Sequence, residues 1–185
     1  MIENYKILED SELAVKSLSS SMSFMELMKR YEKPLFRYIK RISFFTNEEA
    51  EDILQEVFIK IYKNLNNYDP SLKFSSWIYR ITHNQTVDNI RKNSKNKSIP
   101  ILNDDWGQII DKFDLHGYIE SNEIKDKIVI LIEGLPTKYK EVLYLRFLEE
   151  KTYEEISDII EKPKGTVSTL INRGRKILQQ KLSNI

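Results

Sequence analysis

Apolar residues recur at helical spacing along most of the chain, and no stretch shows the sustained alternation of an amphipathic strand. Three apolar stripes are clearest. They consist of Leu27, Tyr31, Leu35, Tyr38 and Ile42, then of Ile53, Val57, Ile61 and Leu65, and then of Phe74, Trp77, Ile78 and Ile81. The stripes predict three helices that pack together, the third running on to about Arg91, and so an all-α fold.

The composition changes near residue 92. The polar run KNSKNKS begins at Lys92, and a poorly periodic stretch with Pro100, Gly107 and Gly117 follows it. Helical patterning resumes near Asn122. We therefore predict two small helical domains, residues 1–92 and 122–185, joined by a flexible linker, residues 93–121.

The second domain has the pattern of a helix-turn-helix. A helix predicted near residue 122 ends at Gly134 and Pro136, a further helix covers 137–149, and 152–160 begins with Thr152 and Glu155 in a capping box. A turn at 161–165 precedes the last helix, and this order is typical of the motif. Its expected buried residues are Val167, Ile171, Gly174 and Leu178.

Charge supports a nucleic-acid partner only locally, because the formal net charge is +1. From Lys162 to Lys181 there are basic residues but no carboxylate, as binding to a DNA backbone requires. Ser168, Thr169, Asn172 and Arg173 should face outward, where each can hydrogen-bond a base edge. A merely solvated basic helix is the alternative.

Catalysis is not indicated. The chain has no cysteine and two isolated histidines, His83 and His116, so we expect no metal and no cofactor. No nucleophile with a partnering base and no phosphate-binding loop is seen, which argues against an enzyme. No apolar run is long enough to span a bilayer, and the N-terminus lacks the apolar core of a signal peptide, so we expect a cytoplasmic protein.

Several short motifs resemble one family. Residues 52–58 read DILQEVF, residues 74–81 read FSSWIYRI, and Asn84, Asp88 and Arg91 follow. In this order and spacing the chain resembles the extracytoplasmic-function (ECF) sigma factors of the sigma-70 family. Leu135-Pro136 and Gly165-Thr166-Val167 resemble marks of sigma region 4. The resemblance implies region 2 in the first domain, region 4 in the second, and a subunit that directs RNA polymerase to promoters and helps to open them.

The resemblance also implies contacts with polymerase. Asp52, Gln55 and Glu56 match the segment that docks on a coiled coil of the largest polymerase subunit in the family. Acids that only offset the helix macrodipole are the alternative for this segment.

Contacts with the -10 element are implied for the loop 66–73, which matches the loop that captures a flipped base, and for the helix after it. The candidate residues are Asn66, Asn67, Tyr68, Lys73, Arg80, Asn84, Asp88, Arg91 and Lys92. An ordinary turn is the alternative for the loop. A hydrogen-bonding role within the domain is the alternative for Asp88. Trp77 lies on an apolar stripe, so we expect it in the core.

Contacts with the -35 element are implied for the last helix. The candidate residues are Lys164, Thr166, Ser168, Thr169, Asn172, Arg173, Arg175 and Lys176. Family members often carry a basic residue at the positions of Ser168 and Leu170, so the -35 sequence read here should differ.

The implied partners are core RNA polymerase and promoter DNA, and an anti-sigma factor is left open. The linker acids Asp104, Asp105, Asp111 and Asp114 either mimic nucleic acid near the RNA exit path or are solvated. Two other functions remain as alternatives: a conventional regulator that binds duplex operator DNA, and a helical adaptor that binds protein alone.

Overall fold

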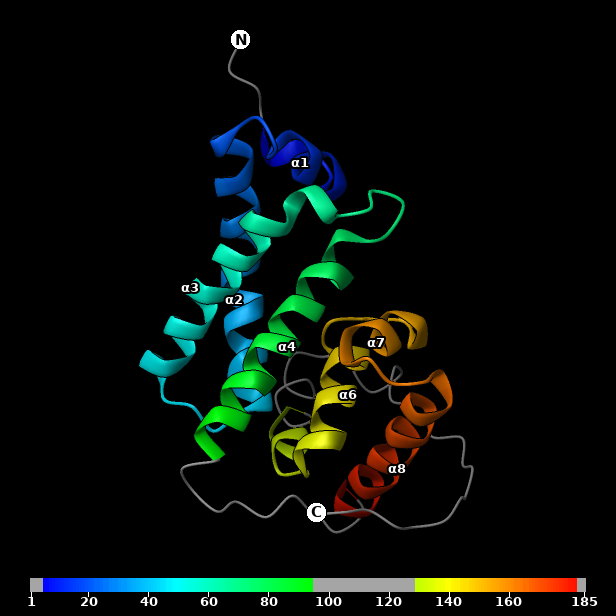
Figure 1. Ribbon diagram of the computed structural model, residues 1–185. Helices are drawn as coiled ribbons and strands as arrows, with labels where there is room; N and C mark the ends of the chain where they lie inside the picture. Colours follow the sequence, from blue (N-terminus) through cyan, green and yellow to red (C-terminus); the bar gives the residue numbers. More distant parts are fainter. Residues whose placement is uncertain (1–4, 95–128, 183–185) are drawn as a thin grey trace. The chain divides into compact units, whose positions relative to one another are not determined.

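A computed structural model describes residues 5–94 and 129–182 of the chain (Figure 1). Every regular element in these residues is a helix, which confirms the predicted all-α class. The chain divides into two compact units, Met1–Lys97 and Ser98–Ile185, and each is described by itself. Beyond residue 94, the predicted linker lies outside the described residues, as do its four acids. None of the described helices combines the length and the apolar character needed to cross a membrane.

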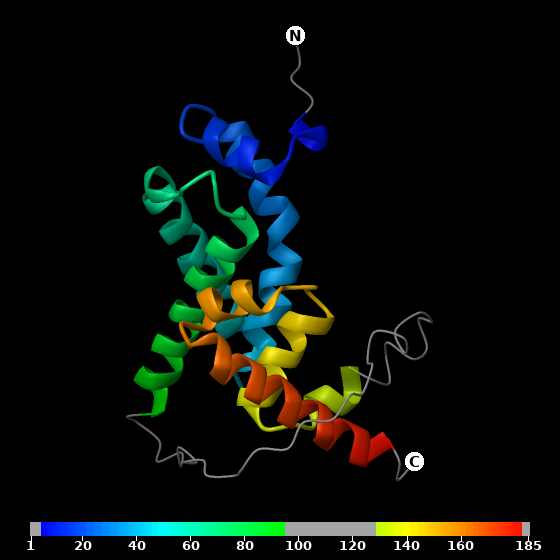
Figure 2. The ribbon, with the colours of Figure 1, turned by 90° about the vertical axis from the view of Figure 1, so that its right-hand side faces the viewer.

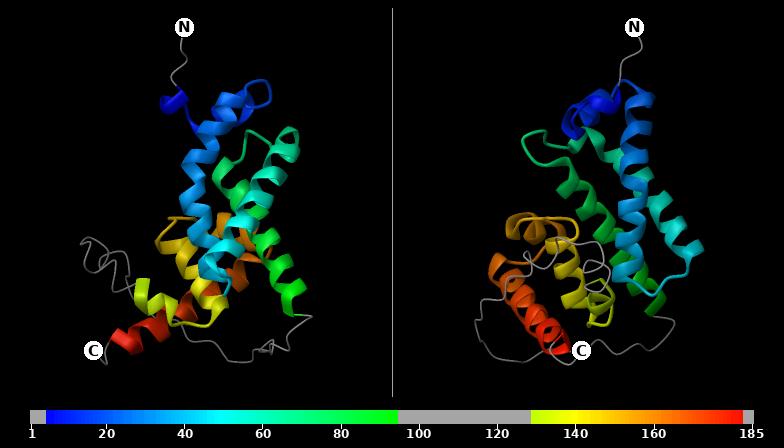
Figure 3. Two further views of the ribbon diagram at one scale, coloured as in Figure 1. Left: turned by 90° about the vertical axis from the view of Figure 1, so that its left-hand side faces the viewer. Right: turned by 180° about the vertical axis from the view of Figure 1, so that it is seen from behind.

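Over residues 5–94, the first unit is a bundle of four α-helices with two short 3-10 turns. Its elements are η1 (Tyr5–Ile7), α1 (Asp10–Lys16), α2 (Ser21–Ile42), α3 (Asn47–Asn64), η2 (Leu65–Asn67) and α4 (Phe74–Ser94). Helices α2, α3 and α4 pack pairwise along their lengths, while the short α1 lies at one end against α2 and α4 (Figures 1 and 3). The loop between η2 and α4 lies at this same end.

Two of the predicted stripes form the centre of this bundle. All four residues of the second stripe are buried, three on α3 and Leu65 at the start of η2, and so are four of the five on α2. Tyr31 is the half-buried exception on α2, because its hydroxyl donates to Asp10 near the surface.

The third stripe lies in the first half of α4, and this helix runs past Arg91 as predicted. Phe74, Trp77 and Ile78 are buried, but Ile81 is half-buried. Further along, α4 buries polar residues, among them Thr82 and Thr86. Their hydroxyls donate to main-chain oxygens one turn earlier, at 2.8 and 2.7 Å, which satisfies them within the helix.

Helix α3 begins with a capping box that the sequence analysis did not identify. The Thr46 hydroxyl accepts from the Glu49 amide at 3.2 Å, and the Glu49 carboxylate accepts from the Thr46 amide at 2.8 Å. Two of the orphan amides at the start of this helix are thereby satisfied.

Within residues 129–182, the second unit has a helical turn at 129–133 and three helices, α6 (Thr137–Phe147), α7 (Tyr153–Ile160) and α8 (Lys164–Leu182), which contact one another (Figure 2). The predicted stop at Gly134–Pro136 is confirmed. The capping box is also confirmed, because Thr152 and Glu155 exchange hydrogen bonds of 3.2 and 2.7 Å. In the turn between α7 and α8, Glu161 adopts a left-handed conformation with φ of 52°.

The buried side of α8 is the predicted one: Val167, Ile171, Gly174 and Leu178 are all buried. A Cβ atom at Gly174 would lie 2.8 Å from Leu143 Cδ1 of α6. The absence of a side chain at Gly174 therefore lets α6 and α8 pack closely, and it fixes which side of α8 faces outward.

Candidate functional site

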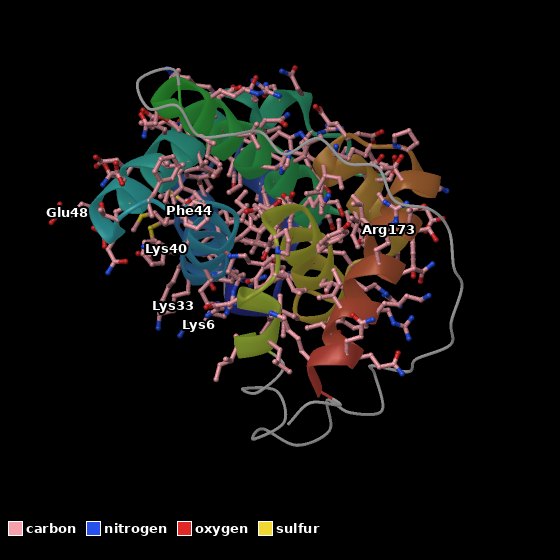
Figure 4. All side chains as sticks on the ribbon, turned by 90° about the horizontal axis from the view of Figure 1, so that it is seen from below. Lys6, Lys33, Lys40, Phe44, Glu48 and Arg173 are labelled. Carbon is pink, nitrogen blue, oxygen red and sulfur yellow. The ribbon has the colours of Figure 1, made fainter. Side chains whose placement is uncertain are left out.

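The outer side of α8 carries the residues predicted to contact the -35 element. Lys164, Thr166 and Thr169 are exposed, and the remaining ones are half-buried, namely Ser168, Asn172, Arg173, Arg175 and Lys176. Figure 4 shows Arg173 on α8. Since the opposite side of the helix is committed to the core, these groups are available to a ligand.

The two arginines of α8 are only partly engaged within the unit. The Nε atoms of Arg173 and Arg175 are buried and have no hydrogen-bond partner among the described residues. A guanidinium carries five N–H donors in a planar fork, so a phosphate or a guanine edge can be bound through the outer nitrogens.

Lys164 is not a free cation on this surface. Its Nζ donates to Glu154 Oε1 of α7 at 2.9 Å, and both side chains are exposed. The hydrogen bond from Lys164 lowers the pKa of Glu154. The stretch from Lys162 to Lys181, which has no carboxylate in sequence, therefore has Glu154 beside it in the fold. A count of charges along this stretch missed Glu154, which lies ten residues before Lys164.

Four of the -10 candidates share one side of α4. Arg80, Asn84, Asp88 and Arg91 follow one another at steps of three or four residues, and Lys92 is adjacent. Arg80 and Asn84 are half-buried, and the others are exposed. Asp88 Oδ1 and Arg91 Nη1 are 3.8 Å apart, which makes them an exposed ion pair on α4 but is too long for a hydrogen bond.

The loop 66–73 is held by its own hydrogen bonds. Its candidates Asn66, Asn67 and Lys73 are exposed. Asp69 Oδ1 accepts from the Ser71 amide at 2.9 Å, and this backbone bond lowers the pKa of Asp69. The loop thus contains a well-formed turn that presents two amides and a lysine to solvent.

Tyr68 is placed differently from the other loop candidates. Its side chain is 8% exposed and lies against Phe74 and Trp77, with ring centroids 5.1 and 5.4 Å away. Its hydroxyl donates to the Leu72 carbonyl oxygen at 2.6 Å. In the described structure Tyr68 therefore supports the loop from beneath instead of lining an open pocket. Trp77 is buried as expected.

The three polymerase-binding candidates are exposed along α3. Glu56 differs from the other two because its carboxylate accepts a hydrogen bond from Gln85 Nε2 of α4. Glu48 lies exposed at the beginning of the same helix and points away from the bundle (Figure 4). Asp52 and Gln55 are thus the cleaner docking candidates, and Glu56 also links two helices.

A groove next to Gln55 was not expected from the sequence. It measures about 440 Å³ between α2 and α3, and its lining residues are Met25, Met28, Lys29, Glu32, Glu51, Leu54, Gln55 and Phe58. Met25 is 60% exposed. An apolar floor within a charged rim is the usual composition of a protein-binding surface. Met25 and Met28, three residues apart on α2, were the sequence signal that could have revealed it.

Comparison with known proteins agrees with this arrangement of two units. The family described as Sigma-70 region 2 matches residues 27–96, and the family described as Sigma-70, region 4 matches residues 126–178. The ECF RNA polymerase sigma factor SigW of Bacillus subtilis is 33% identical over 170 residues, which are 88% of this chain and 90% of SigW. The chain belongs to the ECF sigma factors.

A second relative is also similar in sequence, and one solved structure is similar in fold. The ECF sigma factor SigM of Bacillus subtilis is 28% identical over 158 residues, which are 85% of this chain and 94% of SigM. The fold is that of the sigma factor RpoE from Bartonella quintana, which was solved in complex with the anti-sigma factor NepR. That comparison has a TM-score of 0.62 and 18% identity, and it covers 86% of this chain and 96% of RpoE.

ECF sigma factors are transcription regulators, and neither alternative function is favoured by these matches. Within residues 5–94 and 129–182, no three His, Cys, Asp or Glu side chains are grouped so that they could hold a metal ion.

Proposed function

We propose that this sigma factor acts in the cytoplasm through two domains, residues 1–92 and 122–185, with residues 93–121 as a linker. The first binds core RNA polymerase and the melted -10 strand, and the second reads the duplex -35 element. The chain itself carries out no chemistry. Binding energy opens the promoter. Unstacking the bases costs roughly a few kcal/mol, and the capture of the unpaired bases by the protein offsets part of this cost.

The polymerase-binding surface consists of the exposed side of α3 around Asp52 and Gln55 and the groove beside it. Exposed acids provide steering and register towards a basic partner. The groove provides the apolar area that a stable contact needs, with Met25, Leu54 and Phe58 in its wall. Gln55 belongs to both, so the polar and the apolar parts form one continuous surface.

The -10 surface consists of the loop 66–73 and the side of α4 that carries Arg80, Asn84 and Arg91. The exposed amides of Asn66 and Asn67 can hydrogen-bond a base that has left the stack. Arg80, Arg91 and Lys92 provide positive charge for the phosphates on either side. Asp88 modulates this charge through Arg91.

The -35 surface is the outer side of α8. Asn172 and Arg173 have the chemistry to read base edges, while Arg175 and Lys176 suit phosphate contacts. Lys164 has to give up its bond with Glu154 before it can bind a phosphate. Its contribution to the free energy of DNA binding is therefore smaller than that of a lysine that is only solvated. Ser168 and Leu170 leave this helix without basic side chains at two positions, and its promoter preference should differ accordingly.

An anti-sigma factor is a further proposed partner. RpoE of Bartonella quintana was solved bound to the anti-sigma factor NepR, and its fold is similar to that of this chain. A protein of this class could occupy the groove between α2 and α3 and so compete with polymerase.

One observation carries the proposal most directly: in an ECF sigma factor, the helix-turn-helix turns the acid-free side of α8 outward while its other side is fully packed. The test is to combine the protein with core RNA polymerase, transcribe genomic DNA and sequence the run-off transcripts. We expect transcripts that start downstream of a shared pair of sequence elements. Transcripts no more promoter-directed than those of core polymerase alone would refute the proposal.

A further inference from the structure

Arg30 of α2 fastens the N-terminal segment of the first unit. Its Nη1 donates to the Leu8 carbonyl oxygen and to Asp10 Oδ1, both at 2.8 Å. Its Nη2 donates to the carbonyl oxygens of Tyr5 and Lys6 at 2.9 and 3.0 Å. Its Nε lies 3.4 Å from Glu26 Oε1. We call Arg30 and these five acceptors the N-terminal clasp.

The clasp uses the planar fork of a guanidinium, which can satisfy several fixed acceptors at once. Three of the acceptors are main-chain oxygens, so the contact fixes the path of the backbone from residue 5 to residue 10. The Arg30 side chain is 25% exposed, and the bonds to it are thus only partly open to competition from water.

The clasp continues into the aromatic cluster below the loop 66–73. Tyr31, next to Arg30, donates its hydroxyl to the other carboxylate oxygen of Asp10. The Tyr31 ring packs edge-on against Phe74, with centroids 5.9 Å apart. Phe74 in turn contacts Tyr68 at 5.1 Å, and Tyr68 donates to the Leu72 carbonyl. One run of contacts therefore leads from the N-terminal segment to the loop.

The same end of the bundle holds all of these parts. Helix α1 packs on both α2 and α4, and α1 and the loop preceding α4 lie close together in each view (Figures 1 and 3). The charge of Asp10 also contributes to the raised pKa of Tyr68, after the larger effect of burial and that of Asp69. Asp10 thus interacts with Tyr68 across the cluster as well as with Arg30.

We propose that Arg30, Asp10 and Tyr31 are positioning residues for capture of the -10 base, because they hold the aromatic cluster on which the loop 66–73 rests. This inference depends on the proposed role of that loop. A loop that is already in its binding conformation loses less conformational freedom when it encloses a base, and it binds the base more tightly. Releasing the clasp should therefore weaken base capture while the surfaces on α3 and α8 remain intact.

The sharpest variant is Tyr31→Phe, which removes the hydroxyl bonded to Asp10 and keeps the ring against Phe74. A second, separate variant, Arg30→Gln, removes the guanidinium and with it the hydrogen bonds of the clasp. Tyr62→Phe is the matched control, because it deletes a tyrosine hydroxyl elsewhere in the same unit, where the ring packs on Phe24. Holoenzyme is reconstituted with each variant and titrated with single-stranded DNA carrying the non-template -10 sequence of a promoter found by run-off sequencing.

For Tyr31→Phe we expect affinity for this strand to fall about fivefold, which corresponds to one ordinary hydrogen bond, with a larger fall for Arg30→Gln. The ratio of affinities between this strand and strands changed at the captured base should become smaller. Amide hydrogen exchange in residues 66–73 should become faster. Affinity for core polymerase and for -35 duplex should stay unchanged. Tyr62→Phe should bind the strand as the wild type does.

Two results would overturn the inference. One is unchanged strand affinity and unchanged loop exchange in both clasp variants. The other is an equal loss of affinity for strand, core and -35 duplex, which indicates general destabilisation of the unit. If the wild-type holoenzyme itself fails to bind the strand in preference to a scrambled one, the proposed function fails, and this outcome is distinct from the other two.

Discussion

Arg173 and Lys176 stand one helical turn apart on α8, but their side chains differ in what they can recognise. A guanidinium can form two hydrogen bonds to one guanine, whereas an ammonium acts as a point charge for any phosphate. The Arg173 side chain is also half-buried with its Nε enclosed, which restricts the directions in which its fork can point. The two residues should therefore contribute to different parts of -35 binding.

We predict that Arg173→Ala costs about 1–3 kcal/mol at the preferred -35 element and relaxes base preference there. Lys176→Ala should weaken binding to all sequences alike and reduce the salt dependence by roughly one ionic contact. The measurement is holoenzyme affinity across a randomised -35 library at several salt concentrations. Parallel effects of the two substitutions on every sequence would contradict this division of roles.

Tyr68 provides a residue-scale prediction about pH. Burial raises the pKa of Tyr68, and the charges of Asp69 and Asp10 raise it further. The folded protein therefore holds the phenolic proton more tightly than the unfolded chain does. The corresponding stability is complete below the ordinary tyrosine pKa of about 10, and it is lost as the pH rises from there through the folded-state value.

In wild-type protein the free energy of unfolding should thus fall more steeply above about pH 10 than in Tyr68→Phe, which has no proton to lose at this position. Denaturant unfolding of both proteins from neutral to alkaline pH measures the difference. The comparison removes the common contribution of the other tyrosines and the lysines. Identical slopes in the two proteins would show that the buried hydroxyl does not favour its protonated form in the folded state.

At the scale of elements, two glycines of α8 have opposite surroundings. A Cβ at Gly174 would meet Leu143 and Tyr139 of α6 at 2.8 to 3.3 Å, whereas a Cβ at Gly165 would have no atom within 4 Å. Leu143 is fully buried and has little room to move. The same substitution should therefore have opposite effects at the two sites.

We predict that Gly174→Ala destabilises the second unit by about 1–3 kcal/mol through overpacking against α6. Gly165→Ala should be neutral or stabilise the protein by up to roughly 1 kcal/mol, because alanine favours the helical conformation. Denaturant unfolding followed by circular dichroism checks both. A Gly174→Ala protein as stable as Gly165→Ala would mean that α6 and α8 are not closely packed at this point.

The elements that sequence predicted best are those set by local patterns. The α3 stripe, the buried side of α8 and the Thr152 capping box depend on residues a few positions apart. The extent of α4 was predicted, but the buried side of its second half was missed because that side is polar, with the Thr82 and Thr86 hydroxyls bonded to main-chain oxygens of their own helix. Helix α1 was missed because seven residues carry a weak periodic signal, and Arg30, some twenty residues away, helps to hold it.

For the candidate site, the motifs indicated candidate residues that lie at exposed positions on α3 and at exposed or half-buried positions on α8, and their contacts with polymerase and DNA stay predictions. They could not show that Glu154 pairs with Lys164, that Gln85 binds Glu56, or that Tyr68 lies beneath its loop. Each of these contacts joins different elements, so it depends on packing that no local pattern encodes. The groove between α2 and α3 arises in the same way from two helices meeting.

At the scale of the whole molecule, the proposed functions are divided between two compact units. The proposed polymerase and -10 surfaces lie in the first unit, and the proposed -35 surface lies in the second. Each surface is built from residues of its own unit alone. A substitution in one unit should therefore weaken the contacts proposed for that unit and leave those of the other unit intact. Binding measurements on the holoenzyme can then assign each loss of affinity to one surface.

Docking on polymerase should depend on the charge of Asp52. Asp52→Lys should weaken core association about three- to tenfold at low salt and less at high salt, because an exposed charge acts through screened, long-range attraction. Asp158→Lys, an equal change at an exposed position on α7, serves as the control for net charge. Affinity for core is measured with labelled sigma factor, beside circular dichroism of each variant.

Asp52 tests this surface better than Glu56 does. Reversing Glu56 would also break its bond with Gln85 of α4, so a loss of binding could come from a disturbed helix pair. Asp52 lies on the exposed side of α3, where a lysine can be accommodated without displacing a core side chain. If Asp52→Lys keeps both the wild-type spectrum and full core affinity, docking must rest on the groove lined by Met25 and Leu54 without help from the acid stripe. In that case substitution of Met25 by a charged residue would weaken binding where Asp52→Lys does not.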